Sequence, residues 1–197
     1  FVGMDDYVSL HKVNQPWLDA QFSANTRPHV FVFGHEAAFK AFHTDCLDDF
    51  PAERDTFWRS LAAAGARTYF CGHDHFFDTA RMDDGDGNAN NDLHQVVVGT
   101  GGGDLHDKYN YVGDNSTYLP TGLSHSMTNG YLLVELSGTT DSDLGVTLTF
   151  KQRTVSASGA VSYVPAFTFT YTAASKLGYP IVDSGQVARF NATAEIN

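Results

Sequence analysis

Hydrophobic and polar positions in the first part of the chain follow the periods of helices and strands in turn. Asn14 is a typical helix cap, and the proline two positions later fits the first turn of a helix. Trp17, Leu18 and Phe22 are expected to form the buried stripe of this helix. An uninterrupted apolar run follows at residues 29–33 and ends at a glycine, which predicts a fully buried strand.

The same order of elements then repeats. A second helix is predicted to begin at Pro51, with Phe57 and Leu61 on one face, and to stop at Gly65. Residues 67–71 have the pattern of the next strand. Strand, helix and strand in this order imply two neighbouring parallel strands, whose carboxyl ends lie at the same edge of a sheet.

The second part of the chain, from about residue 94 onward, is rich in β-branched and aromatic residues. Four such runs, separated by Gly, Asp and Ser, predict strands at residues 93–98, 130–136, 145–150 and 162–172. We expect them to continue the sheet in an antiparallel manner, and the tail from residue 173 has no clear pattern. The predicted fold class is therefore α/β with a β-rich second half.

Composition and charge narrow the functions open to this chain. Its 197 residues are enough for one domain or for half of a larger one, and the start at Phe1 is typical of a processed or excised piece. A net charge of −11 argues against nucleic acid as a main partner, because phosphate backbones require patches of Lys and Arg. The apolar runs are too short to span a membrane. An acidic protein can still act on phosphate esters if bound metals supply positive charge.

The two cysteines, Cys46 and Cys71, are too few for a disulfide scaffold, and neither belongs to a C-x-x-C motif. A single bridge between them and a pair of free, buried thiols both remain open. Few lysines and many Gly, Thr, Ser and Asn residues are typical of an exported protein, so we expect a secreted or periplasmic location.

Two motifs place a histidine directly after a predicted buried strand. His35 follows the first strand, and the sequence Gly-His-Asp-His at residues 72–75 follows the second. Because the two strands are expected to be neighbours, His35, His73 and His75 should converge at one edge of the sheet. Imidazole is a common ligand of Zn, Fe, Ni and Mn. A single histidine after a strand is more often a hydrogen-bonded loop residue, but three at the tips of adjacent strands favour a metal site.

The G-H-x-H motif, with a strand and a G-H motif one helix upstream, is similar to the last two motifs of the calcineurin-like metallophosphoesterases, which include the purple acid phosphatases. Residues 15–18 also resemble that family's Q-x-x-W-L helix, and residues 96–102 resemble its strand and glycine-rich turn. The resemblance covers about residues 10–152. It implies that residues 1–152 form the C-terminal part of a two-sheet αββα sandwich, and that residues 153–197 form a β-strand continuation and tail.

The resemblance also implies roles for individual histidines. His35 and His73 would ligate one metal and His75 the other, with Fe, Mn or Zn as the two ions. His43 lies on the loop where purple acid phosphatases carry substrate-facing histidines, which implies a catalytic role. A plain surface-loop histidine is the alternative for His43.

Two acidic residues beside these histidines are candidates for partners that orient the ligands through their free ring nitrogens. Asp74 lies between two of the implied ligands and is expected to point away from the metals. Glu36 fits such a partner and a solvated helix start equally well.

The implied activity is hydrolysis of phosphate mono- or diesters at a dinuclear metal centre. The family's upstream motifs, D-x-H, G-D-x-x-D and G-N-H-[DE], do not occur in this sequence. We therefore expect the chain to be inactive alone and to need an N-terminal half, from the same gene or from a separate chain. The alternatives are an inactive fragment or pseudoenzyme, and a secreted binding module that uses exposed aromatics such as Tyr109, Tyr111 and Tyr118.

Residues 84–92 resemble a calcium loop, because oxygen-bearing side chains occur at alternate positions. The loop departs from the EF-hand pattern at Ala89, where glycine is needed, and at Gln95, where a bidentate glutamate is needed. A solvated hairpin turn is therefore the expected structure. His106 and His125 have no ligand spacing, although their loops can reach the cleft.

Overall fold

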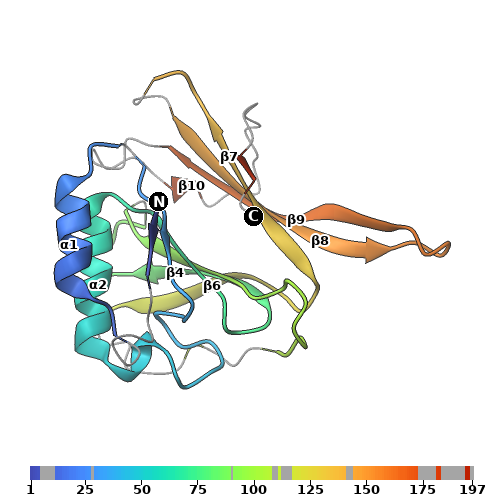
Figure 1. Cartoon of the computed structure of the whole chain (residues 1–197), viewed down its shortest axis with the longest axis horizontal. Helices are drawn as coiled ribbons and strands as arrows, with labels where there is room; N and C mark the ends of the chain where they lie inside the picture. The colour runs from blue at the N-terminus through green and yellow to red at the C-terminus, as the bar shows by residue number, and fades with distance from the viewer. Residues whose placement is uncertain are drawn as a thin grey trace.

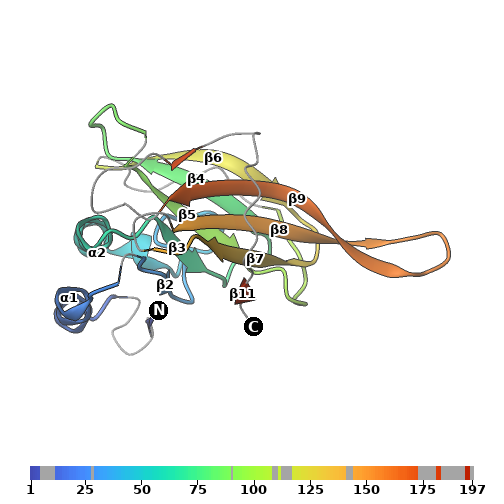
Figure 2. The ribbon, with the colours of Figure 1, turned by 90° about the horizontal axis from the view of Figure 1, so that it is seen from above.

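The computed structural model describes residues 1–4, 12–27, 29–89, 91–107, 111, 117–140, 144–172, 181–182 and 194–195. The elements form a mixed six-stranded sheet and an antiparallel five-stranded sheet, with helices beside the first (Figures 1 and 2). In chain order they are β1 (Val2–Gly3), α1 (Gln15–Ala24), β2 (Val32–Phe33), η1 (Leu47–Asp49), α2 (Pro51–Ala64), β3 (Thr68–Cys71), β4 (Phe77–Asp83), β5 (Leu93–Val98), β6 (Leu119–Ser126), β7 (Gly130–Ser137), β8 (Gly145–Val155), β9 (Val161–Thr172), β10 (Ile181–Val182) and β11 (Ala194–Glu195).

The six-stranded sheet has the order β1-β2-β3-β5-β4-β6. Its first four strands are parallel, and β4 runs antiparallel to both β5 and β6. The predicted parallel pairing of the two strands that precede the histidine motifs is confirmed, with Val32 opposite Tyr69. β2 is shorter than the predicted run 29–33, but Phe31 is buried and its carbonyl accepts a hydrogen bond from the Val2 amide.

Both helices begin at the predicted residues, and α2 also ends at the predicted residue. The Asn14 side chain caps α1 by accepting a hydrogen bond from the amide of Trp17, and Gly65 ends α2 in the left-handed conformation at φ 78°. The prediction that Trp17 is buried is wrong, since 43% of it is exposed. The reason is geometric: Leu18 faces the core, and the preceding side chain points about 100° away around the helix.

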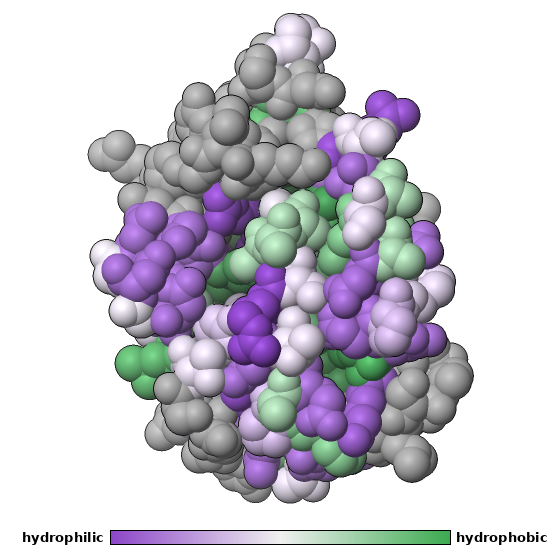
Figure 3. Space-filling model, turned by 90° about the vertical axis from the view of Figure 1, so that its left-hand side faces the viewer, coloured by the Kyte–Doolittle hydropathy of each residue, from purple (hydrophilic) through white to green (hydrophobic). Residues whose placement is uncertain are grey.

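Two apolar clusters hold the layers together. One lies between the helices and the six-stranded sheet and includes Leu18, Phe57 and Trp58. The other joins the two sheets, where the rings of Phe77 and Phe150 stack with their centroids 4.0 Å apart. Burial of each such side chain stabilises the fold by about 1.5–3 kcal/mol relative to exposure. The side of the molecule that carries the helices is mostly hydrophilic outside, with scattered apolar residues (Figure 3).

The β-rich second half differs from the prediction in detail. β7, β8 and β9 form an antiparallel meander, as expected, but they build a second sheet and do not continue the first one. β8 and β9 continue into a hairpin that extends beyond the body (Figure 1). The predicted division after residue 152 therefore falls within β8. Strands β4 and β6 were not predicted, because a bulge between Thr79 and Ala80 interrupts their pairing and β6 contains proline and glycine.

Cys46 and Cys71 are buried thiols that are not joined by a disulfide, so of the two alternatives the pair of thiols is present. Among the described residues, no helix is both long enough and apolar enough to cross a membrane.

Candidate metal centre

His35 and His73 meet at the carboxyl ends of β2 and β3. Two backbone hydrogen bonds tie the turns together, since the Gly34 amide donates to the Phe70 carbonyl and the Gly72 amide donates to the His35 carbonyl, each over 3.0 Å. His35 Nε2 then lies 3.2 Å from His73 Nδ1. The predicted convergence of these two histidines is therefore present in the structure.

The separation of these two nitrogens fits two ligands of one ion. Imidazole nitrogens that each lie about 2.0–2.1 Å from a shared metal are separated by roughly 3 Å. Asp45 Oδ1 lies 3.2 Å from His73 Nε2, and a hydrogen bond donated by Nε2–H leaves the Nδ1 lone pair facing His35. The same hydrogen bond lowers the pKa of the Asp45 carboxyl. Sequence reasoning did not identify Asp45, because it lies on an irregular loop.

The backbone of His73 has a positive φ of 62°, the only such value among the described residues other than glycine. L-residues rarely adopt this region, and such strain persists only where the surroundings enforce it. The Asp74 amide, which donates to the Gly72 carbonyl over 2.6 Å, closes the turn around His73. The turn thereby points the imidazole toward His35 and Asp45.

His75 lies two residues after His73. Among the described residues, its ring nitrogens do not form a cluster of three possible ligands with those of His35 and His73. Its Nδ1 is 3.0 Å from the Asp104 carbonyl, so Nδ1 donates and Nε2 keeps its lone pair. The His75 amide donates to His106 Nε2 over 3.2 Å. His106 thus reaches the histidine motif, as its loop position allowed, and accepts a hydrogen bond from the backbone of His75. Burial, and secondarily the nearby His43, lowers the pKa of His106.

Asp74 is almost fully buried, with 2% of its surface exposed, and contacts His43. Its Oδ1 accepts hydrogen bonds from the His43 amide over 3.0 Å and from His43 Nδ1 over 2.5 Å. The carboxylate therefore fixes the tautomer of His43 with the proton on Nδ1. The His43 ring lies 4.3 Å from the His73 ring, centroid to centroid, and a third of the side chain is exposed.

Glu36 is completely buried, so its interpretation as a solvated helix start is wrong, and no helix follows it. The loop after His35 is held in place by hydrogen bonds from a buried side chain. Gln95, also fully buried, accepts hydrogen bonds from the amides of Ala38 and Phe39 and donates to the Phe39 carbonyl, all within 2.8–2.9 Å. The residue that departs from the EF-hand pattern therefore has a role in shaping this loop.

The glycine-rich turn after β5 closes tightly on the histidine motif. A Cβ atom at Gly99 would lie 1.9 Å from the Asp74 carbonyl oxygen, and one at Gly103 would lie 2.6 Å from the His75 ring. Beyond this turn lies a cleft of about 580 Å³, lined by residues 100–105 together with Asn129, Gly130, Arg153 and Tyr163. The turn thus separates His75 from an open, mostly polar cleft.

Three aromatic residues were predicted to be exposed. Tyr118 is buried, with 6% of its surface exposed, and the half-buried Tyr111 donates a hydrogen bond to Asp78. Tyr109 lies outside the described residues. His125 is also engaged, with its ring nitrogens 3.3 Å from Asp78 and 3.1 Å from Asp107. Tyr111 and Tyr118 therefore do not provide the exposed surface that a binding module requires.

No family model matches the sequence, and no curated protein matches it. GAP50, the anchor in the inner membrane complex of Plasmodium, is similar in structure, with a TM-score of 0.52 at 17% identity over 84% of this chain and 48% of GAP50. PhoD has a TM-score of 0.52 at 12% identity over 88% of this chain and 35% of PhoD. Purple acid phosphatase PPD1 from yellow lupin (Lupinus luteus) seeds has a TM-score of 0.49 at 17% identity, over 79% of this chain and 27% of PPD1.

The chain thus spans less than half the length of each of these structures. At identities this low, the likeness to GAP50 and PhoD shows a related fold and nothing of the chemistry. The class defined here is an α/β protein of this fold, with histidines gathered at the carboxyl ends of its parallel strands.

Proposed function

We propose that this chain supplies the histidine half of a metal-dependent phosphoester hydrolase site. The observation that carries the proposal is the 3.2 Å approach of His35 Nε2 to His73 Nδ1 at the ends of two parallel strands, with His75 beside them. The fold related to that of PhoD and the resemblance of the G-H and G-H-x-H motifs to calcineurin-like metallophosphoesterases support the same conclusion.

In this proposal His35 and His73 hold one ion and His75 holds a second. Nitrogen ligands, completed by carboxylates, suit Fe, Mn or Zn. When bound, such ions would polarise the phosphate oxygens and lower the pKa of a coordinated water. Asp45 orients His73 through Nε2, and the Asp104 carbonyl orients His75 through Nδ1.

His43 acts on the substrate side of the site. Because Asp74 holds the proton on Nδ1, Nε2 of the partly exposed ring is the atom available for a phosphate oxygen or a leaving-group oxygen. Asp74 is therefore a positioning residue for His43, and Glu36 is a buried residue supporting the loop of His35.

The rest of the site must come from outside this chain. A bridging carboxylate and further ligands belong to the family's three upstream motifs, none of which occurs here. We propose that an N-terminal half, from the same gene or as a separate chain, supplies them and completes the αββα sandwich. We further propose that the complete protein acts on phosphate mono- or diesters in a secreted or periplasmic location.

A non-catalytic protein is the second candidate function, favoured by the absence of the upstream motifs. Zn²⁺ or Mn²⁺ titration of the purified chain, followed by assays with p-nitrophenyl phosphate and its bis ester, separates the two. The enzyme proposal expects metal binding that His35→Ala and His73→Ala abolish, with hydrolysis only after the upstream half is added. Metal binding without hydrolysis in the completed protein would support the non-catalytic candidate. Unchanged metal binding in both variants would contradict the site itself.

A further inference from the structure

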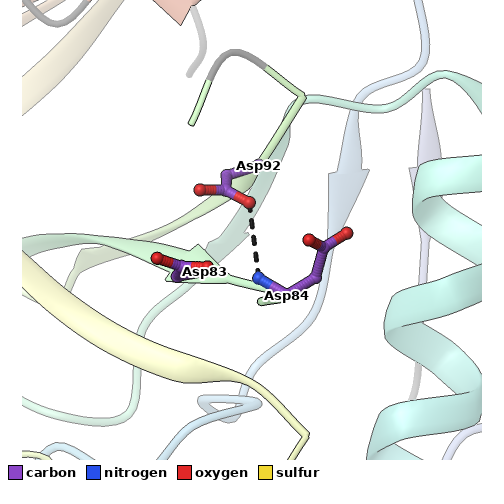
Figure 4. Close-up of side chains that lie close together, drawn as sticks. All are labelled: Asp83, Asp84 and Asp92. Carbon is purple, nitrogen blue, oxygen red and sulfur yellow. Dashed lines mark hydrogen bonds between the residues drawn. The ribbon is translucent and has the colours of Figure 1, made fainter. Parts of the chain in front are cut away.

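The mouth of the β4–β5 hairpin gathers three carboxylates. Antiparallel pairing places Met82 opposite Leu93, so Asp83 at the end of β4 and Asp92 just before β5 face each other across the next position. Asp84 follows directly, and one carboxylate oxygen from each of the three residues lies within 4.8 Å of the others. Figure 4 shows the three side chains around the hairpin mouth.

Asp92 is the buried member of this group, with 2% of its surface exposed. Its Oδ1 accepts one long hydrogen bond, 3.4 Å, from the Asp84 amide (Figure 4). Its Oδ2 is buried and receives no hydrogen bond from any described residue. Nη1 of Arg81 forms an ion pair with this oxygen over 3.6 Å, which is beyond hydrogen-bond distance. A buried carboxylate oxygen without a donor is costly unless a cation completes it.

The local charge is also unbalanced. Like charges directly opposite each other across a strand pair destabilise the pairing. The three carboxylates outnumber the two guanidinium groups that act on Asp92, those of Arg81 and Arg67, so a net negative charge remains. Burial, aided by the charges of Asp83 and Asp84, raises the pKa of Asp92 to about 6, in agreement with this imbalance.

We propose that Asp83, Asp84 and Asp92 form a binding site for a divalent cation, Ca²⁺, at the mouth of the β4–β5 hairpin. The three residues offer only oxygen ligands, the kind that hard cations prefer. Oxygens bound to one Ca²⁺ at 2.3–2.6 Å lie at most about 5 Å apart, so the observed spacing fits. Asp84 is exposed, which leaves one side of the site open for entry and for waters that complete the coordination.

This site is separate from the histidine centre and does not depend on the proposed function. β4 begins at Phe77, beside the histidine motif, and ends at Asp83, so about 20 Å of strand separates the two. The cation would join the two ends of the hairpin loop and remove the repulsion between them. Its role is therefore to stabilise the β4–β5 hairpin.

Thermal unfolding of the purified chain in Ca²⁺ and in a chelator tests this proposal, with calorimetric titration of Ca²⁺ beside it. We expect Ca²⁺ to raise the Tm of the wild type, and Asp92→Asn and Asp84→Asn to weaken Ca²⁺ binding about tenfold or more. Asp84 is exposed, so the second variant is informative even if the first fails to fold. Asp49→Asn, an exposed acid outside the group, should keep the full shift.

Two readouts separate a cation site from a structural ion pair and from the histidine centre. In the chelator, Asp92→Asn should be as stable as the wild type or more stable, because repulsion is removed. If Asp92→Asn were much less stable than the wild type in the chelator, Asp92 would be identified as the necessary partner of Arg81, and the proposal would be overturned. The proposal would also be overturned if Ca²⁺ did not raise the Tm of the wild type, or if it raised the Tm of Asp92→Asn and Asp84→Asn as much as that of the wild type. Loss of the Tm shift in His73→Ala would overturn it as well.

Discussion

One carboxylate oxygen of Asp74 accepts two hydrogen bonds from His43, one from its backbone amide and one from its imidazole Nδ1–H. The residue between the two histidines of G-H-x-H thereby joins the turn after β3 to the loop after β2. A buried carboxylate with two donors is well satisfied, so the two loops hold a single relative arrangement. This bond positions His43 through residues of this chain alone.

Removal of the Asp74 carboxylate should therefore cost stability. Asp74→Ala leaves the His43 amide without its acceptor, and we expect the free energy of unfolding to fall by about 2–3 kcal/mol. Urea denaturation measures this loss. Asp49→Ala, at an exposed acid of η1, is the matched control and should change the free energy by less than about 0.5 kcal/mol. Equal effects of the two substitutions would show that the Asp74–His43 bond does not stabilise the fold.

A methyl group at Gly103 should displace the His75 imidazole, because its Cβ would lie 2.6 Å from the ring. We expect Gly103→Ala to weaken binding of the ion assigned to His75 while the ion held by His35 and His73 is retained. Gly101→Ala, two residues earlier in the same turn, meets no atom within 4 Å and serves as the control. Stoichiometric titration with Zn²⁺, on the protein completed with its upstream half, compares them, and indistinguishable titrations would argue against a role for His75.

Gln95 should be required for the loop that follows His35. Gln95→Leu keeps the side-chain volume but leaves two amides and one carbonyl at residues 38–39 without partners, which should cost about 3 kcal/mol or more. Gln21→Leu, at an exposed position of α1, should be nearly neutral. Chemical denaturation of both variants checks the difference. A Gln95→Leu protein as stable as Gln21→Leu would mean that the loop is held by other contacts.

The two thiols should not react in the native protein. Both cysteines are buried, and burial raises the pKa of Cys46 to about 12, so almost no Cys46 thiolate is present at pH 8. With Ellman's reagent at pH 8 we expect no rapid reaction of the folded chain and two thiols per chain after denaturation. One or more fast-reacting thiols under native conditions would contradict the buried arrangement.

The local sequence pattern was sufficient to predict the strands that carry the candidate site. Apolar runs that end at glycine predicted the tips of β2 and β3, and therefore the meeting of His35 and His73. Asp45 and His106 were not predicted as neighbours of these histidines, because they lie on irregular loops whose position depends on long-range packing. The burial of Glu36 was missed for the same reason, since nothing local shows that the loop folds inward.

Metal content per purified chain, measured by elemental mass spectrometry after incubation with Zn²⁺ or Mn²⁺ and gel filtration, tests the central claim most directly. The account predicts that the wild-type chain retains transition metal, and that His35→Ala and His73→Ala lose it while Asp49→Asn does not. Close to two metal ions per chain would show that the upstream carboxylates are already supplied. One metal ion per chain would indicate that only the histidine half of the site is present. A wild-type chain that retains no more metal than His73→Ala would contradict the account.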